Sequence, residues 1–184
     1  TTKAFGILAV GSDPSRNYNV LENTKIKDNI TIITSHKLKK LDKINNIKII
    51  NGNFYNSKIS DCELRKFYRD TFVVLVPLKD VNQPVGQSVV LQAMAVGKPV
   101  IFTKIKGHWS EKLISWKNCI LVPPNDINSI ENAIETLKGN NDLYKNICLE
   151  ARKTVLDNYG IKHIESSINT IIETAFKIKN NSLK

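Results

Sequence analysis

Two loops of this 184-residue chain combine glycine with residue types that bind phosphate. Segment 11–17 (GSDPSRN) follows an apolar run, and its glycine lets backbone approach a ligand while Arg16 donates a fork of hydrogen bonds to an anion. In segment 83–88 (QPVGQS), Gly86 and Ser88 mark a tight turn into a helix start, where free N–H groups favour a diphosphate. An ordinary helix cap is the alternative interpretation of the second loop.

Other kinds of site receive less support from the residue spacings. The chain has neither the G-x-G-x-x-G of dinucleotide-binding folds nor the G-x-x-x-x-G-K-[ST] of P-loop proteins. His36 and His108 have no carboxylate or cysteine partner at a recognisable spacing, so we expect both in surface loops. No His, Cys and carboxylate residues have metal-ligand spacing, and we therefore expect no required metal or other cofactor.

The elements that must position the two loops alternate between strand and helix. Strands are predicted at 5–10, 30–34, 47–50, 72–76, 99–103 and 119–122, and helices at 18–25, 61–70, 88–96, 126–139, 143–156 and 161–179. The strand runs are apolar throughout, which is typical of a parallel sheet covered on both faces. We predict an α/β fold, a Rossmann-like doubly wound parallel sheet of about six strands with helices on both faces. Ligands bind beyond the carboxyl ends of such strands, where both loops fall.

Composition places the chain among ordinary globular proteins, with 41% hydrophobic and 24% charged residues. No apolar run approaches the roughly 20 residues that cross a bilayer, and the first residues do not resemble an export signal. The three cysteines are far apart and are expected to be reduced thiols, so we expect a cytoplasmic protein.

The net charge of +10 comes mostly from lysines spread along the chain. We interpret them as solvated surface, although a basic surface also attracts nucleotide phosphates, anionic lipids and nucleic acid. Trp109 and Trp116 are expected to pack in the protein, because a nucleic-acid platform would interleave several aromatics with arginine. Nucleic acid is therefore not an expected partner.

Segment 91–101 (LQAMAVGKPVI) carries a specific resemblance. It is similar to the L-E-A-M-A-x-G-x-P-V-I stretch in the donor domain of GT-B glycosyltransferases of the retaining, group 1 (family 4) type. The likeness extends to segment 10–13 (VGSD) and to segment 118–126 (NCILVPPND), in the same order. It implies that residues 1–179 form the C-terminal, nucleotide-sugar-binding half of a GT-B fold. Residues 180–184 are expected to be a disordered tail, and the N-terminal acceptor domain is expected to be absent from this chain.

The resemblance implies transfer of a sugar from a nucleoside-diphosphate sugar to an acceptor, with retention at the anomeric carbon, as in hexosyltransferases. The implied partners are the nucleotide-sugar donor, the N-terminal domain of the same enzyme, and a glycan or lipid-linked acceptor. Cell-envelope polysaccharide or glycan synthesis is the expected setting, with possible peripheral association at the inner face of the membrane. We expect this chain alone to bind donor but to transfer sugar poorly.

The implied donor site follows from the matching positions. Arg16 matches a basic residue that contacts the donor diphosphate and is the expected catalytic residue. The donor-binding residues implied by the resemblance are Gly11, Ser12, Arg16, Asn17, His36, Asn53, Phe54, Gly86, Gln87, Ser88 and Gln92. Among them, His36, Asn53 and Phe54 are expected near the base.

Two positions depart from the family pattern, in which two glutamates form an E-x7-E pair. Gln92 stands at the second glutamate, which holds the donor ribose, and Pro84 stands at the first. A glutamine amide still hydrogen-bonds a ribose hydroxyl, whereas Pro84 offers no polar side chain to the sugar. A non-catalytic nucleotide-sugar-binding or scaffold module is therefore an alternative function, and a basic module on membranes or nucleic acid is another.

Overall fold

The computed structural model describes residues 6–52 and 59–181. Its sheet has six parallel strands in the order β3-β2-β1-β4-β5-β6. The strands are β1 (Ile7–Val10), β2 (Ile30–Thr34), β3 (Ile47–Asn51), β4 (Val73–Val76), β5 (Val100–Thr103) and β6 (Ile120–Val122). The predicted doubly wound parallel sheet of six strands is confirmed.

The described α-helices are α1 (Asp61–Asp70), α2 (Gln87–Ala95), α3 (Ile127–Gly139), α4 (Asn141–Asn158) and α5 (Ile161–Asn181). Short 3-10 helices occupy Tyr18–Leu21 (η1) and Leu41–Lys43 (η2). The helix predicted over 18–25 is wrong in type and length, because η1 is one 3-10 turn. Only Tyr18 and Leu21 of that turn are buried, and their three-residue spacing matches the 3-10 period.

The apolar strands separate two cores, one on each face of the sheet. Alternate strand residues such as Ala9 and Leu75 face η1 and α3 on one side. Leu8 and Val74 face α1 and α2 on the other. All four residues of β4 are buried, as expected for a central strand covered above and below.

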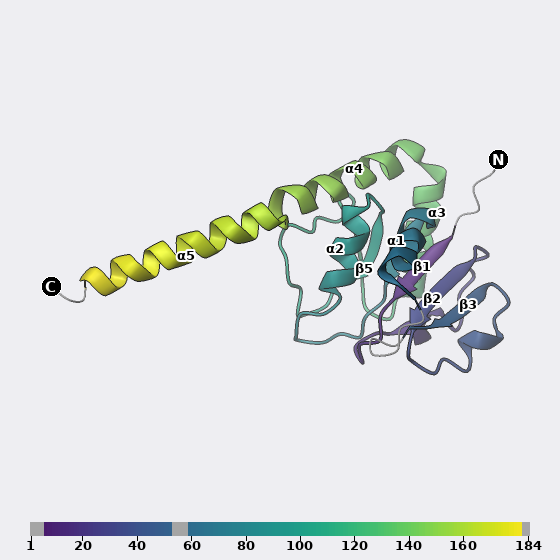
Figure 1. The fold of residues 1–184 in the computed structure, drawn as a ribbon. Coiled ribbons are helices and arrows are strands. Elements are labelled where there is room, and N and C mark those ends of the chain that lie inside the picture. The colour runs from purple at the N-terminus through teal and green to yellow at the C-terminus, as the bar shows by residue number, and fades with distance from the viewer. Residues whose placement is uncertain (1–5, 53–58, 182–184) are drawn as a thin grey trace.

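Helix α5 extends away from the body of the protein (Figure 1). It continues two residues past its predicted end at 179, and residues 182–184 lie outside the described part of the chain. Large apolar side chains are exposed along it, namely Ile161, Ile168, Ile171 and Ile172. None of the helices within 6–52 and 59–181 is long and apolar enough to cross a membrane.

The two tryptophans differ in their surroundings. Trp109 meets Tyr159 edge to face, with ring centroids 6.0 Å apart. Trp116 is 44% exposed and has a φ of 62° in the turn before β6, so the prediction that it packs in the protein is wrong. The turn bends back to bond the Trp116 N–H to the Cys119 carbonyl, and this geometry directs the indole outward.

Candidate functional site

The loops after β1 and β4 form one unit at the carboxyl edge of the sheet. The chain leaves β1 toward β2 and leaves β4 toward β5, so the strand order reverses between them. A crevice opens at such a switch point in doubly wound folds. The Asn17 N–H donates to the Pro77 carbonyl at 3.0 Å, and the Lys79 N–H donates to the Ser15 carbonyl at 2.8 Å.

A local turn aims Arg16 back toward this junction. The Asp13 carboxylate accepts from the Ser15 N–H at 2.8 Å, and the Arg16 N–H donates to the Asp13 carbonyl at 2.9 Å. Pro14 fixes the turn at the position where its ring is favoured. Burial alone would raise the pKa of Asp13, but the bonds from Ser15 and the charge of Arg16 outweigh it and lower that pKa.

The Arg16 side chain is a buried charge whose hydrogen bonds are incomplete within the described part of the chain. The residue is 6% exposed, and its Nε and Nη1 atoms find no hydrogen-bond acceptor among the described residues. Burial lowers the pKa of Arg16, yet a guanidinium remains protonated in proteins. An unpaired buried cation costs on the order of several kcal/mol. An anion from outside the chain would supply the missing hydrogen-bond acceptors.

Two glycines with positive φ enclose the guanidinium. Gly11 has a φ of 133°, and a Cβ there would lie 2.5 Å from Arg16 Nε. Gly86 has a φ of 82°, and a Cβ there would lie 3.6 Å from Arg16 Nη1. The structure thus brings together three residues from the two loops that the sequence predicts to bind phosphate.

The start of α2 differs from the starts of neighbouring helices. Ser60, Asp126 and Asn140 cap α1, α3 and α4 by accepting a first-turn N–H. Gly86 caps α2 and has no side-chain acceptor to offer. Gln87 and Ser88, the first two residues of α2, are exposed. Their end of the helix carries a partial positive charge that adds to that of Arg16.

Two tyrosines flank the guanidinium, and neither was singled out in the sequence. Tyr18 donates to the Gly11 carbonyl at 2.7 Å, and Tyr68 donates to Gln92 Oε1 at 3.1 Å. Burial raises the pKa of Tyr18 to about 12 and also raises that of Tyr68, against the charge of Arg16. A buried tyrosine needs a partner for its hydroxyl, but its partner depends on the fold.

Gln92 lies on α2 beside a hollow of about 360 Å³ that is lined on its other side by α1. Asp61, Arg65 and Tyr68 also line this hollow. Because the Gln92 oxygen accepts from Tyr68, its amide nitrogen remains as the group that can meet a ligand.

Ser12 links three loops at the carboxyl edge. Its hydroxyl donates to the Gly52 carbonyl at 3.1 Å and accepts from the Ser35 N–H at 2.8 Å. His36 Nε2 lies 3.1 Å from the Ser12 carbonyl, so this nitrogen donates. The predicted residues Ser12 and His36 are thus in contact, after β1 and β2. Asn53 and Phe54 lie outside the described residues.

The Asn17 side chain is engaged elsewhere. Its amide donates to Asn125 Oδ1 at 2.6 Å, across to the loop that leads into α3. Asn125 has a φ of 58°, a conformation that asparagine adopts more readily than most residues. The bond ties the loop after β1 to the loop after β6, which makes Asn17 a link between loops.

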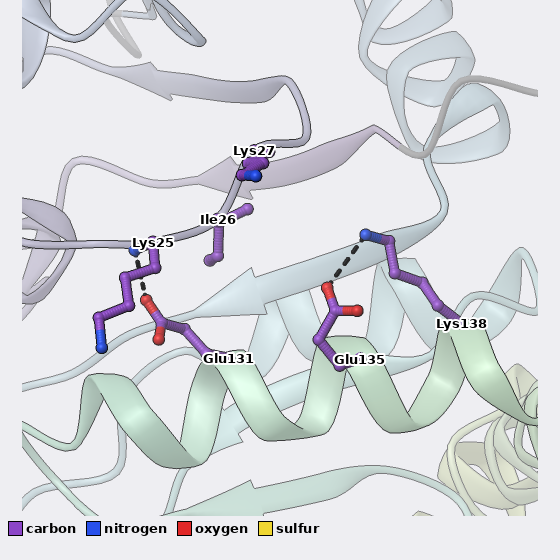
Figure 2. Close-up of a pocket in the computed structure, with 6 residues that line it drawn as sticks. All are labelled: Lys25, Ile26, Lys27, Glu131, Glu135 and Lys138. Atoms are coloured by element: carbon purple, nitrogen blue, oxygen red, sulfur yellow. Dashed lines mark hydrogen bonds and ion pairs between the residues drawn. The ribbon is translucent and has the colours of Figure 1, made fainter.

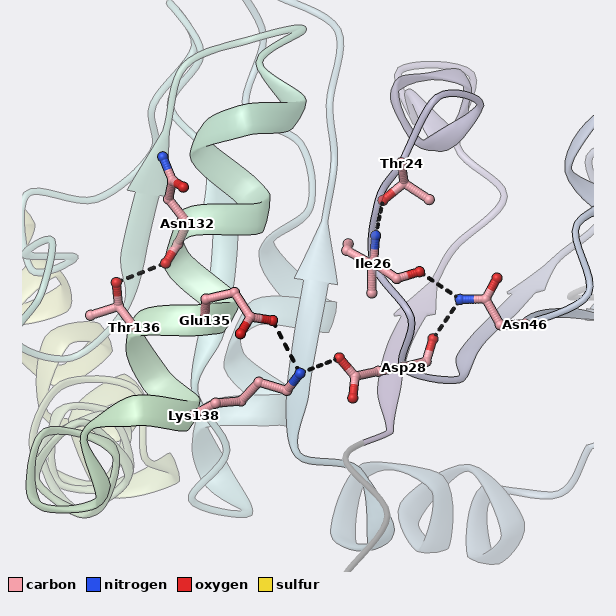
Figure 3. A network of polar contacts seen from close by, with 8 residues as sticks. All are labelled: Thr24, Ile26, Asp28, Asn46, Asn132, Glu135, Thr136 and Lys138. Carbon is pink, nitrogen blue, oxygen red and sulfur yellow. Dashed lines mark hydrogen bonds and ion pairs between the residues drawn. The ribbon is translucent and has the colours of Figure 1, made fainter.

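A second charged pocket, of about 390 Å³, lies at the amino edge of the sheet (Figure 2). Lys138 contacts Asp28 at 2.6 Å and Glu135 at 3.1 Å. Glu131 accepts from the Lys25 N–H at 2.5 Å. Figure 3 shows how Lys138 and Asp28 join α3 to the segment before β2. These carboxylates pair with groups of the protein itself, so the pocket joins α3 to the segment before β2. We call Lys25, Asp28, Glu131, Glu135 and Lys138 the Lys138 clamp.

Asn46 extends that clamp to the segment before β3. Its amide donates to the Ile26 and Asp28 carbonyls, each at 2.8 Å (Figure 3).

Within residues 6–52 and 59–181, no three His, Cys, Asp or Glu side chains gather as metal ligands would.

Comparison with known proteins gives a family and a fold. A family model described as Glycosyl transferases group 1 matches residues 7–140. Anabaena HepE, solved in complexes with UDP and with UDP-glucose, is 15% identical in the UDP complex with a TM-score of 0.74. That match covers 94% of this chain and 49% of HepE.

Two further structures are similar. Sucrose-phosphate synthase from Thermosynechococcus elongatus has a TM-score of 0.76 at 19% identity, over 95% of this chain and 46% of its own. The C-terminal domain of a glycosyl transferase group 1 family protein (LpcC) from Francisella tularensis has a TM-score of 0.67 at 20% identity. That match covers 85% of this chain and 87% of the domain. The chain spans about half the length of the first two proteins, and no curated protein sequence matches it.

Proposed function

The chain belongs to the glycosyl transferases group 1 family, and from that membership we propose that it binds the nucleoside-diphosphate sugar in a glycosyltransferase. One observation carries the proposal: two nitrogens of the buried Arg16 guanidinium, beside the start of α2, reach no acceptor among the described residues. A diphosphate at this point would supply the missing acceptors. It would also meet the positive end of the α2 dipole.

The same geometry would assist breakage of the bond between sugar and diphosphate. Negative charge builds on the β-phosphate as that bond breaks, and Arg16 and the Ser88 end of α2 would stabilise it. Removing one such donor typically raises a barrier by about 3 to 4 kcal/mol. Because protein groups supply this charge, the proposal includes no required metal, and chelator should leave activity unchanged.

The nucleoside would extend from the diphosphate toward β2 and β3. The Gln92 amide beside the hollow between α1 and α2 is suited to a ribose hydroxyl, and His36 lies near the expected base. Asn53 and Phe54 would complete the base site. The complexes of HepE with UDP and UDP-glucose favour UDP as the first nucleotide to test.

Several finer assignments belong to the same proposal. The reaction would retain the anomeric configuration, as in family 4 hexosyltransferases, and would serve cell-envelope polysaccharide or glycan synthesis. A second, N-terminal domain would carry the acceptor site for a glycan or lipid-linked substrate, at the cytoplasmic face of the membrane. The half-length coverage of HepE and the exposed isoleucines of α5 support a second domain.

A thermal-shift panel of UDP, GDP and ADP, with their sugar conjugates, tests the proposal. A ligand at about a hundred times its dissociation constant should add roughly 2.7 kcal/mol of stability. We expect one nucleotide class to stabilise the chain and the same ligand to have no effect on Arg16→Ala. If no nucleotide shifts the unaltered chain, or if Arg16→Ala responds equally, the proposed site is wrong.

A second candidate is a nucleotide-sugar-binding module without turnover. Pro84 and Gln92 favour it, because they replace both carboxylates of the family pattern. Product formation distinguishes the two candidates. Sugar transfer by the full-length protein excludes the binding module, whereas tight donor binding with no product over many hours excludes the enzyme.

A further inference from the structure

The loop after β5 packs directly against the loop that leads into α2. The Gly107 N–H donates to the Val81 carbonyl at 2.8 Å. A Cβ at Gly107 would lie 2.5 Å from the carbonyl carbon of Gln83, so only glycine allows this approach. The next residue, His108, therefore lies beside the segment that leads to Gly86.

His108 also contacts the layer beneath the helix start. Its ring centroid lies 6.1 Å from that of Phe102. Phe102 Cε2 in turn lies 3.2 Å from the position that a Gly86 Cβ would take. His108 thus lies one side chain away from the start of α2, on the β5 side, whereas Arg16 approaches from the β1 side.

The two ring nitrogens of His108 have different surroundings. Nδ1 is buried and has no hydrogen-bond partner among the described residues. A proton on Nδ1 would bury an N–H group without an acceptor, which is more costly than burying a bare lone pair. The residue is only half-buried, and of its two ring nitrogens only Nδ1 is both buried and without a partner among the described residues. The favoured tautomer therefore presents an Nε2–H donor outward.

The order of the strands indicates which part of a bound nucleotide sugar this donor would face. In the proposed function the diphosphate lies above β1 and β4, and the nucleoside extends toward β2 and β3. On the other side of β4 the sheet continues through β5 and β6. In this arrangement the transferred sugar would extend from the diphosphate toward β5. The β5 loop places His108 there, while Pro84 supplies no polar side chain at the position where the family pattern has a carboxylate.

We propose that His108 is a specificity-determining residue that donates from Nε2 to a hydroxyl of the transferred sugar. This inference rests on the proposed function and deepens it. It assigns the sugar contact to the loop after β5. A hydroxyl accepts as well as donates, so a neutral imidazole N–H is a suitable partner for it.

Isothermal titration of this chain with UDP and with UDP-glucose tests the inference. The unaltered chain should bind UDP-glucose about fivefold more tightly than UDP, the effect of one hydrogen bond. In His108→Phe, which keeps a ring against Phe102, the two affinities should become equal through a loss for UDP-glucose alone. In His108→Gln, whose amide nitrogen stands near the Nε2 position, part of the preference should return.

The other two histidines provide matched controls. His163→Phe, on α5, should leave both affinities unchanged, and His36→Phe should weaken UDP and UDP-glucose by the same factor. Equal affinities in the unaltered chain, or an equal loss for both ligands in His108→Phe, would overturn the sugar contact while leaving nucleotide binding intact. Absence of UDP binding by the unaltered chain would instead overturn the proposed function, and the His108 contact with it.

Discussion

Arg16 and Lys138 are both cations held largely away from water, at opposite edges of the same sheet. Arg16 is 6% exposed, and the Lys138 side chain is 22% exposed. Lys138 contacts two carboxylates of the protein, whereas two nitrogens of Arg16 reach no acceptor in the described chain. The two cations therefore suit different roles. Lys138 is paired within the protein and joins elements, whereas Arg16 has nitrogens that are available to bind an anion.

Replacing Arg16 should give the largest effect and should move binding and stability in opposite directions. We expect Arg16→Met to weaken nucleotide binding by at least about 100-fold, because two charge-assisted hydrogen bonds are lost. Without ligand, the variant should unfold at equal or higher urea concentration, since an unpaired charge leaves the interior. Titration calorimetry and urea unfolding measure the two quantities. Unchanged affinity with lowered stability would make Arg16 a structural residue and would remove the contrast.

Replacing Lys138 should show the reverse pattern. Lys138→Met leaves Asp28, 15% exposed, without its cation, and should lower the free energy of unfolding by about 2 kcal/mol. Nucleotide affinity should stay the same, because the pocket lies at the other edge of the sheet. The double variant Asp28→Leu with Lys138→Met should recover most of the stability. A nucleotide-binding defect in Lys138→Met would show that the two edges are coupled.

Gly11→Ala tests whether the glycines hold the guanidinium in place. The new Cβ would lie 2.5 Å from Arg16 Nε and would displace it. We expect nucleotide affinity to fall about tenfold, less than on deletion of the charge, because a displaced guanidinium still attracts the diphosphate. Gly139→Ala is a matched control, since a Cβ there meets no atom within 4 Å. Equal affinity in both variants would mean that Arg16 adopts another position when it binds.

The pH dependence of the Lys138 clamp should give the smallest effect. Burial alone would lower the pKa of Lys138, but its bonds to Asp28 and Glu135 raise that pKa above the ordinary 10.5. A raised pKa gives stability that is complete below the ordinary value and is lost as pH rises through the folded value. The stability gap between the unaltered chain and Lys138→Met should therefore stay constant from neutral pH to about pH 10 and narrow above it. Urea unfolding across this range measures the gap. A gap that narrows as the pH falls from 10 to 7 would contradict the assignment.

The fold and the positions of the two glycine-containing loops could be predicted because their signals are local. Strand β2 and helix α1 begin and end at the predicted residues, since β-branched runs and the Ser60 cap act within a few positions. The predicted helix over 18–25 was wrong because burial of Tyr18 and Leu21 against the sheet outweighs local helical propensity. Tertiary packing, which cannot be read from the local sequence pattern, determines the structure of that segment.

The contacts around the site could not be predicted, because they join residues far apart in sequence. Tyr68 and Gln92 are 24 positions apart, and Asn17 and Asn125 are 108 apart. His108 was expected in a surface loop, and its place beside Phe102 depends on how the loops after β4 and β5 pack. The sequence predicted residue types suited to phosphate, whereas the lack of an acceptor for two Arg16 nitrogens in the described chain is a property of the fold.

The Ser12 hydroxyl has a consequence for the thermodynamics of binding. One oxygen atom joins the loops that follow β1, β2 and β3 before any ligand is present. The conformational entropy of ordering those contacts is therefore lost when the chain folds, and binding does not incur it again. Immobilising a side chain on binding costs roughly 0.5 to 1.5 kcal/mol, so each group already fixed leaves that much more free energy for affinity. In the proposed function, preorganisation of this edge would make the strength of nucleotide binding depend on a serine that need not touch the nucleotide.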